Sequence, residues 1–79
     1  MSDVRVEKLA RVLVEKYRIQ PQEIVGLMVD RNEWSIIGLM GILMAGGAYL
    51  PVDASYPGTR IGYMLADSGC RVRIPPVLS

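Results

Sequence analysis

The stretch IVGLMVDRNEWSIIGLMGILMAGGAYLPVD, from Ile24 to Asp53, decides the fold. Its first six residues, Ile24–Val29, form a short uncharged run without polar alternation, which is typical of a strand buried on both faces. A largely apolar helix is predicted over Glu33–Ala45, and it ends at Gly46-Gly47, where one glycine takes the left-handed conformation that closes many helices. A second short strand follows over Ala48–Val52. A strand, a helix and a strand in this order predict a right-handed parallel βαβ unit.

The segments on either side of this unit continue the alternation. A first helix is predicted over about Asp3–Tyr17, and Pro21 stops its continuation. One face of that helix, at a period of 3.6 residues, carries Val6, Leu9, Ala10, Leu13 and Tyr17. A third helix over about Thr59–Ser68 and a third strand over Cys70–Ile74 complete the chain. The predicted fold is therefore α/β, in the order α-β-α-β-α-β, with a short three-stranded parallel sheet flanked by helices.

Polar residues and a proline mark where the predicted helices begin. Ser2 or Asp3 can cap the first helix, and Asp30 or Asn32 can cap the second. Pro57 suits the first turn of the third helix, because its ring fixes a helical φ angle.

A long uncharged stretch raises the possibility of a membrane span. No charged residue occurs over the 19 positions from Trp34 to Val52, a length that can cross a bilayer. The glycine pair Gly46-Gly47 and Pro51 interrupt this stretch, and no cluster of basic residues flanks it. We favour a buried helix over 33–45 with a strip of small residues for close packing, formed by Ser35, Gly38 and Gly41. A chain of this size cannot cover such a helix on all sides, which indicates a piece of something larger or self-association.

Length and composition exclude several classes of protein. The 79 residues carry nine Lys and Arg, eight Asp and Glu, no histidine and one cysteine, Cys70. They amount to a single partial domain, 1–79, too small for most complete enzymes. The net charge of +1 gives no electrostatic footprint for nucleic acid or an anionic membrane. A lone cysteine forms no internal disulfide, and with no histidine it builds no zinc site, so we expect a cytoplasmic protein.

Few residues qualify as candidates for chemistry, and each has a simpler structural interpretation. Asp30 and Asp53 follow predicted parallel strands, where α/β sheets bind ligands, but a turn carboxylate is the favoured interpretation of both. Gly46-Gly47 follows a helix and lacks the Lys of a phosphate loop, so it is a helix stop. Cys70 is expected to be a packed strand residue rather than a reactive thiol. The scattered aromatic residues are expected to pack in the core or at its edge; they are Trp34, Tyr49, Tyr56 and Tyr63.

Three linked motifs carry a family resemblance. The run GLMGILMAGGAYLPVD, from Gly38 to Asp53, is followed by Tyr56-Pro57 with Arg60-Ile61 and then by YMLADSG over Tyr63–Gly69. It closely resembles the adenylation domains of non-ribosomal peptide synthetases, in the adenylate-forming superfamily, which carry L-K-A-G-x-A-Y-[LV]-P-[ILV]-D, Y-P-x-x-R-I and Y-M-L-x-D-[SA]-G. Upstream, Ile24–Arg31 is similar to the family's V-G-[IL] strand and D-R-S turn. The resemblance covers about residues 3–73 and identifies a fragment of the N-terminal subdomain.

The chain also departs from the family pattern. Met44 stands where the family usually has lysine, which lengthens the uncharged stretch. Ala54 replaces a usual proline, and Asn32 replaces a usual serine. The family's Ser/Thr/Gly-rich nucleotide loop, its nucleotide-contacting aspartate, its amino-acid pocket and its late catalytic lysine lie beyond the region of resemblance.

The resemblance implies a parent that uses ATP and magnesium to form an aminoacyl adenylate in secondary-metabolite biosynthesis. It implies no catalytic, cofactor-binding or metal-binding residue in this chain, which is expected to be inactive alone. The expected partners are the remainder of the adenylation domain and, through it, a carrier protein, with self-association as an alternative and without nucleic acid or membrane. Two other interpretations stay open: a non-catalytic binding or assembly module that keeps the fold, and a small membrane protein.

Overall fold

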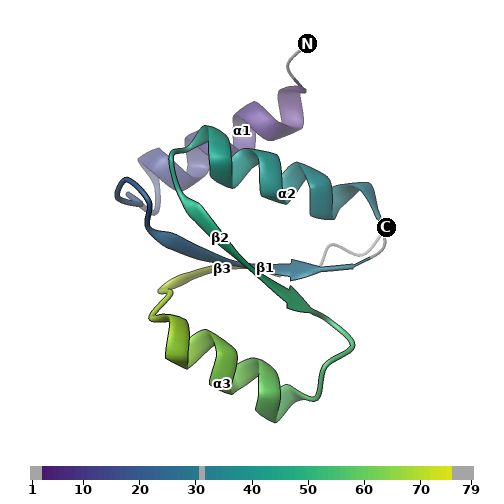
Figure 1. The fold of residues 1–79 in the computed structure, drawn as a ribbon. Coiled ribbons are helices and arrows are strands. Elements are labelled where there is room, and N and C mark those ends of the chain that lie inside the picture. Colours follow the sequence, from purple (N-terminus) through teal and green to yellow (C-terminus); the bar gives the residue numbers. More distant parts are fainter. Residues whose placement is uncertain (1–2, 31, 76–79) are drawn as a thin grey trace.

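The computed structural model describes residues 3–30 and 32–75, which alternate between helices and strands. The order is α1 (Val4–Glu15), β1 (Ile24–Val29), α2 (Glu33–Met44), β2 (Ala48–Asp53), α3 (Gly58–Ser68) and β3 (Val72–Ile74). The strands form a parallel sheet in the order β2-β1-β3. Helices α1 and α2 lie on one face of this sheet and α3 lies on the other (Figure 1). The predicted α/β class and the three-stranded parallel sheet are confirmed.

The central strand β1 pairs with both neighbours in a fixed register. Ile24 aligns with Ala48 of β2, and Gly26 aligns with Arg73 of β3. The ladder to β2 includes the Ala48 N–H donating to the Glu23 carbonyl at 2.9 Å. Since β1 lies between two strands and two helical layers, its uncharged sequence matches its position in the sheet.

The hydrophobic core lies mainly between the sheet and the α1–α2 layer. Val25 and Ile42 are fully buried, and Leu13 is 1% exposed. The whole cluster consists of Leu13, Ile19, Val25, Leu27, Ile42 and Val72. On the α3 side Leu65 is the buried residue of the helix. Burial of apolar surface on one side of the sheet therefore supplies most of the stabilisation of this fold.

Glycines on α2 let this helix approach its neighbours closely. A Cβ atom added at Gly38 would lie 2.6 Å from Leu27 Cδ1 of β1. One added at Gly41 would meet three atoms of Leu9 on α1, at 2.6, 2.9 and 3.1 Å. Gly38 and Gly41 of the predicted strip of small residues thus lie at the contact surface of α2, whereas the Ser35 hydroxyl bonds to the backbone of Asp30.

The opposite face of α2 is left uncovered. Ile36 is 60% exposed, and Met40, Leu43 and Met44 are each about half exposed. The helix has 12 residues, and over residues 3–30 and 32–75 no helix has the length and apolarity needed to cross a membrane. The uncharged stretch is instead divided between α2, a glycine turn and β2.

The end of α1 differs from the prediction. The helix ends at Glu15, with Lys16 as its C-cap, rather than at Tyr17. Arg18 takes a positive φ of 50°, and the Ile19 N–H donates to the Leu13 carbonyl at 3.2 Å, which turns Ile19 into the core. Burial of Ile19, rather than the ring of Pro21, therefore ends the helix.

The other boundaries shift by one or two residues. Ala45 is the C-cap of α2 rather than its last helical residue. Helix α3 begins at Gly58, one residue before the predicted start, with Pro57 at the N-cap. Strand β3 begins at Val72 rather than at Cys70, because the Cys70 N–H donates to Ser68 Oγ at 3.2 Å and stays in the turn.

Arg71, in the turn before β3, contacts the loop that follows α1. Its Nε atom lies 2.9 Å from Glu23 Oε2, and its Nη2 atom donates to the carbonyls of Tyr17 and Arg18 at 2.7 and 3.1 Å. The Gln20 N–H also donates to the Glu23 carboxylate, at 2.8 Å. The pKa of Glu23 lies below its ordinary value because of this N–H and the Arg71 guanidinium.

We expect Gly41→Ala to lower the free energy of unfolding by about 1–2 kcal/mol, measured by urea denaturation. Overpacking against Leu9 costs about 1–3 kcal/mol, and the gain in helix propensity of about 1 kcal/mol offsets only part of it. Gly62→Ala is the matched control, because nothing lies within 4 Å of a Cβ added there; it should stabilise by about 0.5–1 kcal/mol. Equal stabilities of the two variants would refute the close packing at Gly41.

We expect the stability difference between the wild type and Glu23→Gln to depend on pH. A pKa lowered in the folded chain stabilises it above the unfolded value, and this contribution is lost as pH falls through the folded value. The wild type should therefore be the more stable at pH 7, with a difference that shrinks below the ordinary pKa of 4.5. Urea denaturation at pH 7 and pH 3 checks this, with Glu15→Gln as the control for net charge. A difference independent of pH would contradict it.

Candidate functional site

The carboxyl ends of β1 and β2 flank a hollow on the surface. Its lining consists of Val29, Asp30, Pro51, Asp53, Ser55 and Tyr56. The register places Val29 beside Asp53, so both candidate carboxylates meet at this edge. Ligands of open α/β sheets bind outside the carboxyl ends of the strands. This hollow is therefore the candidate site among the described residues.

Asp53 closes the turn that follows β2. Its Oδ1 atom accepts hydrogen bonds from the Ser55 N–H at 2.9 Å and from the Ser55 hydroxyl at 2.8 Å. The Tyr56 N–H donates to the Asp53 carbonyl at 3.1 Å, and the Arg60 guanidinium lies 4.2 Å from the centre of the Tyr56 ring. The interpretation of Asp53 as a turn carboxylate is confirmed. Ser55 was not among the predicted residues, although the Asp-x-Ser spacing is a signal for this turn.

The turn after β1 is held by a serine of α2. The Asp30 N–H donates to Ser35 Oγ at 2.8 Å, and the same hydroxyl donates to the Asp30 carbonyl at 2.7 Å. Asn32 Oδ1 accepts from the N–H groups of Trp34 and Ser35 at 3.1 and 3.3 Å. Of the two predicted caps, Asp30 and Asn32, it is therefore Asn32 that caps α2. The side chain of Ser35 forms part of the turn.

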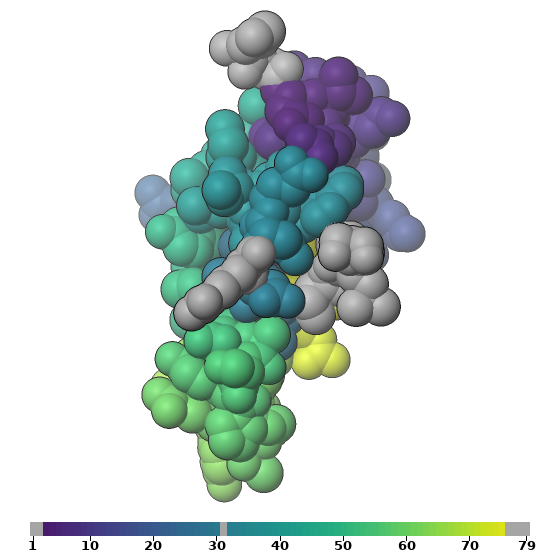
Figure 2. All heavy atoms as spheres, turned by 90° about the vertical axis from the view of Figure 1, so that its right-hand side faces the viewer, coloured from purple at the N-terminus to yellow at the C-terminus, as the bar shows by residue number. Residues whose placement is uncertain are grey.

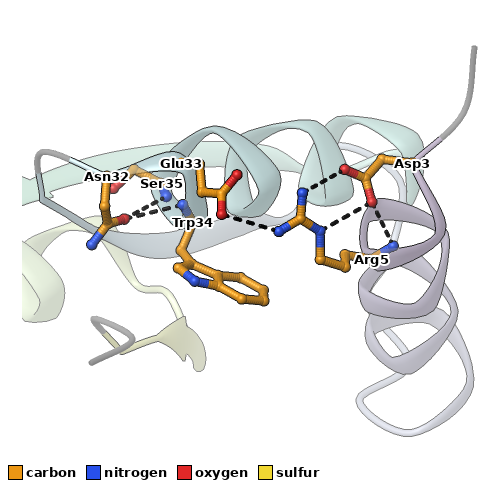
Figure 3. Close-up of polar contacts among 6 residues, drawn as sticks. All are labelled: Asp3, Arg5, Asn32, Glu33, Trp34 and Ser35. Atoms are coloured by element: carbon orange, nitrogen blue, oxygen red, sulfur yellow. Dashed lines mark hydrogen bonds and ion pairs between the residues drawn. The ribbon is translucent and has the colours of Figure 1, made fainter. Parts of the chain in front are cut away.

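A cluster of charged residues joins the beginnings of α1 and α2 (Figure 3). Asp3 caps α1 by accepting from the Arg5 N–H at 2.8 Å, and Ser2, the alternative cap, lies outside the described residues. The Arg5 guanidinium lies 3.0 Å from Asp3 Oδ2 and 3.3 Å from Glu33 Oε1, and 5.1 Å from the centre of the Trp34 ring. Its hydrogen bonds lower the pKa of Asp3, and the two carboxylates raise the pKa of Arg5. The arrangement joins the beginnings of two helices.

The described lining of the hollow carries two carboxylates, Asp30 and Asp53, whose charge repels a nucleotide triphosphate. Within the part of the chain that the structure describes, no lysine or arginine lines the hollow. The first N–H groups of α2, which bind phosphate in many α/β proteins, already donate to Asn32. Over residues 3–30 and 32–75, no three acidic, Cys or His side chains gather into a metal-binding group. The geometry supports a scaffold with closed turns.

The remaining candidates are structural. Gly46 has a φ of 86°, and the N–H groups of Gly46 and Gly47 donate to the Leu43 and Ile42 carbonyls at 3.0 Å, which is a Schellman helix stop. Cys70 is half-buried, with its Sγ atom 3.8 Å from the Leu65 carbonyl, so packing is confirmed although the residue precedes β3.

The aromatic residues only partly match the prediction. Trp34 and Tyr56 are half-buried, whereas Tyr49 is exposed on the edge strand β2. Tyr63 is 78% exposed on α3, so the prediction that it packs in the core or at its edge is wrong. Its helix has one buried position, Leu65, and Tyr63 lies on a different face.

Known proteins share this sequence and fold. The family model of AMP-binding enzymes matches residues 2–77. Gramicidin S synthase 2 of Brevibacillus brevis is 51% identical over 70 residues, which are 89% of this chain and 2% of that protein. Bacitracin synthase 3 of Bacillus licheniformis is 59% identical over 64 residues, 81% of this chain and 1% of that protein.

The fold is similar to a solved N-terminal subdomain. The Klebsiella oxytoca NpsA N-terminal subdomain in complex with 3-hydroxyanthranilyl-AMSN matches with a TM-score of 0.75 and 25% identity, over 87% of this chain and 18% of that chain. This chain therefore spans only a small part of each of these relatives. It belongs to the AMP-binding enzyme family, as a part of the N-terminal subdomain of an adenylation domain of the non-ribosomal peptide synthetase type.

Proposed function

We propose that this chain is a structural, non-catalytic part of a domain that activates an amino acid with ATP as an aminoacyl adenylate. The observation that carries the proposal is the AMP-binding family match over residues 2–77. The NpsA subdomain is described in complex with 3-hydroxyanthranilyl-AMSN, and the synthases that this chain resembles are named for peptide products. Together these support an acid-activating role for the parent domain in peptide synthesis.

The proposal divides the work between this chain and the rest of the domain. Hydrogen bonds of Ser35 and Ser55 hold the turns at Asp30 and Asp53. This chain therefore fixes the shape of the sheet where β1 and β2 end. We expect ATP and magnesium to bind to other segments of the domain, because two carboxylates in the described lining of the hollow repel a triphosphate. The aminoacyl group of the adenylate is then transferred to the thiol of a carrier protein as a thioester, and AMP is the leaving group. The free thiol of Cys70 is in keeping with work in the reducing cytoplasm.

Self-association is a second candidate role, favoured by one surface. The exposed face of α2 presents four large apolar side chains, Ile36, Met40, Leu43 and Met44. Exposed apolar surface of this kind marks contacts with other protein. In the first proposal the parent domain covers this face, and in the second a copy of the chain covers it.

A segment exchange tests the proposed function. Replacing the 70 matched residues of gramicidin S synthase 2 with those of this chain should retain amino-acid-dependent ATP–pyrophosphate exchange. We expect a rate within about tenfold of the unchanged synthetase, which corresponds to about 1.4 kcal/mol in the barrier. The control is the same exchange carrying Gly41→Ala, which should lower the melting temperature through the contact with Leu9. A soluble, folded exchange protein without activity would contradict the scaffold role.

The isolated chain is expected to bind no Mg-ATP. In a two-dimensional amide spectrum of residues 1–79, stepwise addition of Mg-ATP should leave the peaks around Asp30 and Asp53 unmoved. Sedimentation of the same sample separates the two candidate roles, since a defined dimer would favour self-association. Saturable peak shifts, or pyrophosphate exchange by the chain alone, would contradict the proposal that ATP binds to other segments of the domain.

A further inference from the structure

We infer that Met44 is a site of oxidation by hydroperoxides, and that it stays open to water when the rest of the domain covers the middle of α2. The oxidation itself goes beyond the proposed function, whereas the accessibility of Met44 in the parent domain rests on it. The inference assigns a modification site and marks where the contact surface of α2 ends.

The described methionines fall into two pairs by their exposure. Met40 and Met44 are 49% and 54% exposed, and they lie one helical turn apart on α2. Met28 on β1 and Met64 on α3 are half-buried. Oxidation of a sulfur-containing side chain follows its exposure to the oxidant in water. In the isolated chain Met40 and Met44 are therefore the reactive pair.

Met44 and Met40 differ in their place along the helix. Met44 is the last helical residue of α2, whereas Met40 lies in its second half between the exposed side chains of Ile36 and Leu43. Beyond Met44 the chain turns at Gly46, and outside the two chain neighbours no described atom lies within 4 Å of a Cβ added there. A covering segment that buries Ile36 and Leu43 therefore also buries Met40, and it can end before Met44.

The residue that the resembled motif has at this position supports the same division. That motif usually has lysine where this chain has Met44. An ammonium group is costly to bury without a partner. The last turn of a helix also favours a cation, because its free carbonyls carry partial negative charge. We therefore expect position 44 to face water in the parent domain.

The rest of the domain is the occupant of the middle of α2. The matched region is 18% of the NpsA N-terminal subdomain, so most of a subdomain of that size lies outside this chain. The other side of α2 is already packed, with Gly38 against Leu27 and Gly41 against Leu9. A helix that is apolar nearly all round is stable where protein covers both sides.

The proposed reaction is a two-electron transfer of oxygen from the peroxide to sulfur. The Met44 thioether sulfur attacks one oxygen of hydrogen peroxide, so that an S–O bond forms while the O–O bond breaks. The departing hydroxide takes the proton of the transferred hydroxyl group and leaves as water. Sulfur is oxidised to the sulfoxide, which is polar, and the peroxide is reduced. Because position 44 faces water, this polar product leaves packing and activity unchanged.

Peroxide mapping by mass spectrometry tests the accessibility of each methionine. The samples are the isolated chain and the synthetase that carries this chain by segment exchange, each sampled over time in hydrogen peroxide. In the isolated chain Met40 and Met44 should oxidise within about threefold of each other and faster than Met28 and Met64, as their exposure predicts. In the synthetase Met44 should keep its rate within about threefold, whereas Met40 should slow by about tenfold or more, because burial excludes the peroxide.

Three outcomes of the mapping would overturn the inference. One is equal behaviour of Met40 and Met44 in the synthetase. Another is a Met44 that oxidises no faster than Met28 in the isolated chain. The third is a Met40 already slow in an isolated chain that sediments as a dimer, since that result assigns the face to a second copy.

Two lysine substitutions form a matched pair, because Met40 and Met44 are nearly equally exposed on the same helix. In the isolated chain neither Met44→Lys nor Met40→Lys should prevent folding. In the synthetase Met44→Lys should keep pyrophosphate exchange within about twofold, whereas Met40→Lys should reduce soluble yield by about tenfold or more, because it buries an unpaired charge. Equal effects of the two substitutions in the synthetase would overturn the inference.

The proposed function and this inference fail in different ways. A folded synthetase that carries the unsubstituted chain but lacks activity contradicts the proposed function, and the oxidation rates of Met40 and Met44 in it still decide the inference. An active synthetase in which the two methionines oxidise at equal rates overturns the inference and leaves the proposed function intact.

Discussion

The close approach of α2 to its neighbours is the contact on which the rest of this structure depends. A helix with so few polar residues is stable only where other elements cover it. Gly38 lets Leu27 of β1 reach the helix, and Gly41 does the same for Leu9 of α1. The two contacts pack α2 against both the central strand β1 and the first helix α1. They also determine which side of α2, around Met40, stays uncovered.

The same packing explains why the candidate site is a scaffold. Helix α2 begins immediately after β1, and its Asn32 and Ser35 side chains close the turn there. The turn after β2 is closed in the same manner by Asp53 and Ser55. The Asp53 carboxylate and the backbone of Asp30 are thus both engaged in turns after the strands. Rigid turns of this kind position loops that other segments of a domain use for binding.

The two faces of the sheet are covered to different extents. The molecule measures 36 by 28 by 16 Å, and the green atoms of α3 gather at the end of the molecule away from the purple atoms of α1 (Figure 2). Helix α3 lies on the opposite side of the sheet from α1 and α2 (Figure 1). The core is concentrated under α1 and α2, while α3 contributes Leu65. These asymmetries are what a sheet has when it is part of a larger one.

The sequence by itself determined the type and order of all six elements, because apolar periodicity and the glycine stops are local signals. It also determined the turn role of Asp53 and the stop at Gly46. Strand order, the exposure of Tyr63 and the end of α1 at Glu15 were decided by tertiary structure. Each of these depends on contacts between residues distant in the chain: Ile19 turns into the core, and β1 takes the centre between β2 and β3. No local pattern records which distant surfaces meet, since that is decided when apolar surface is buried jointly.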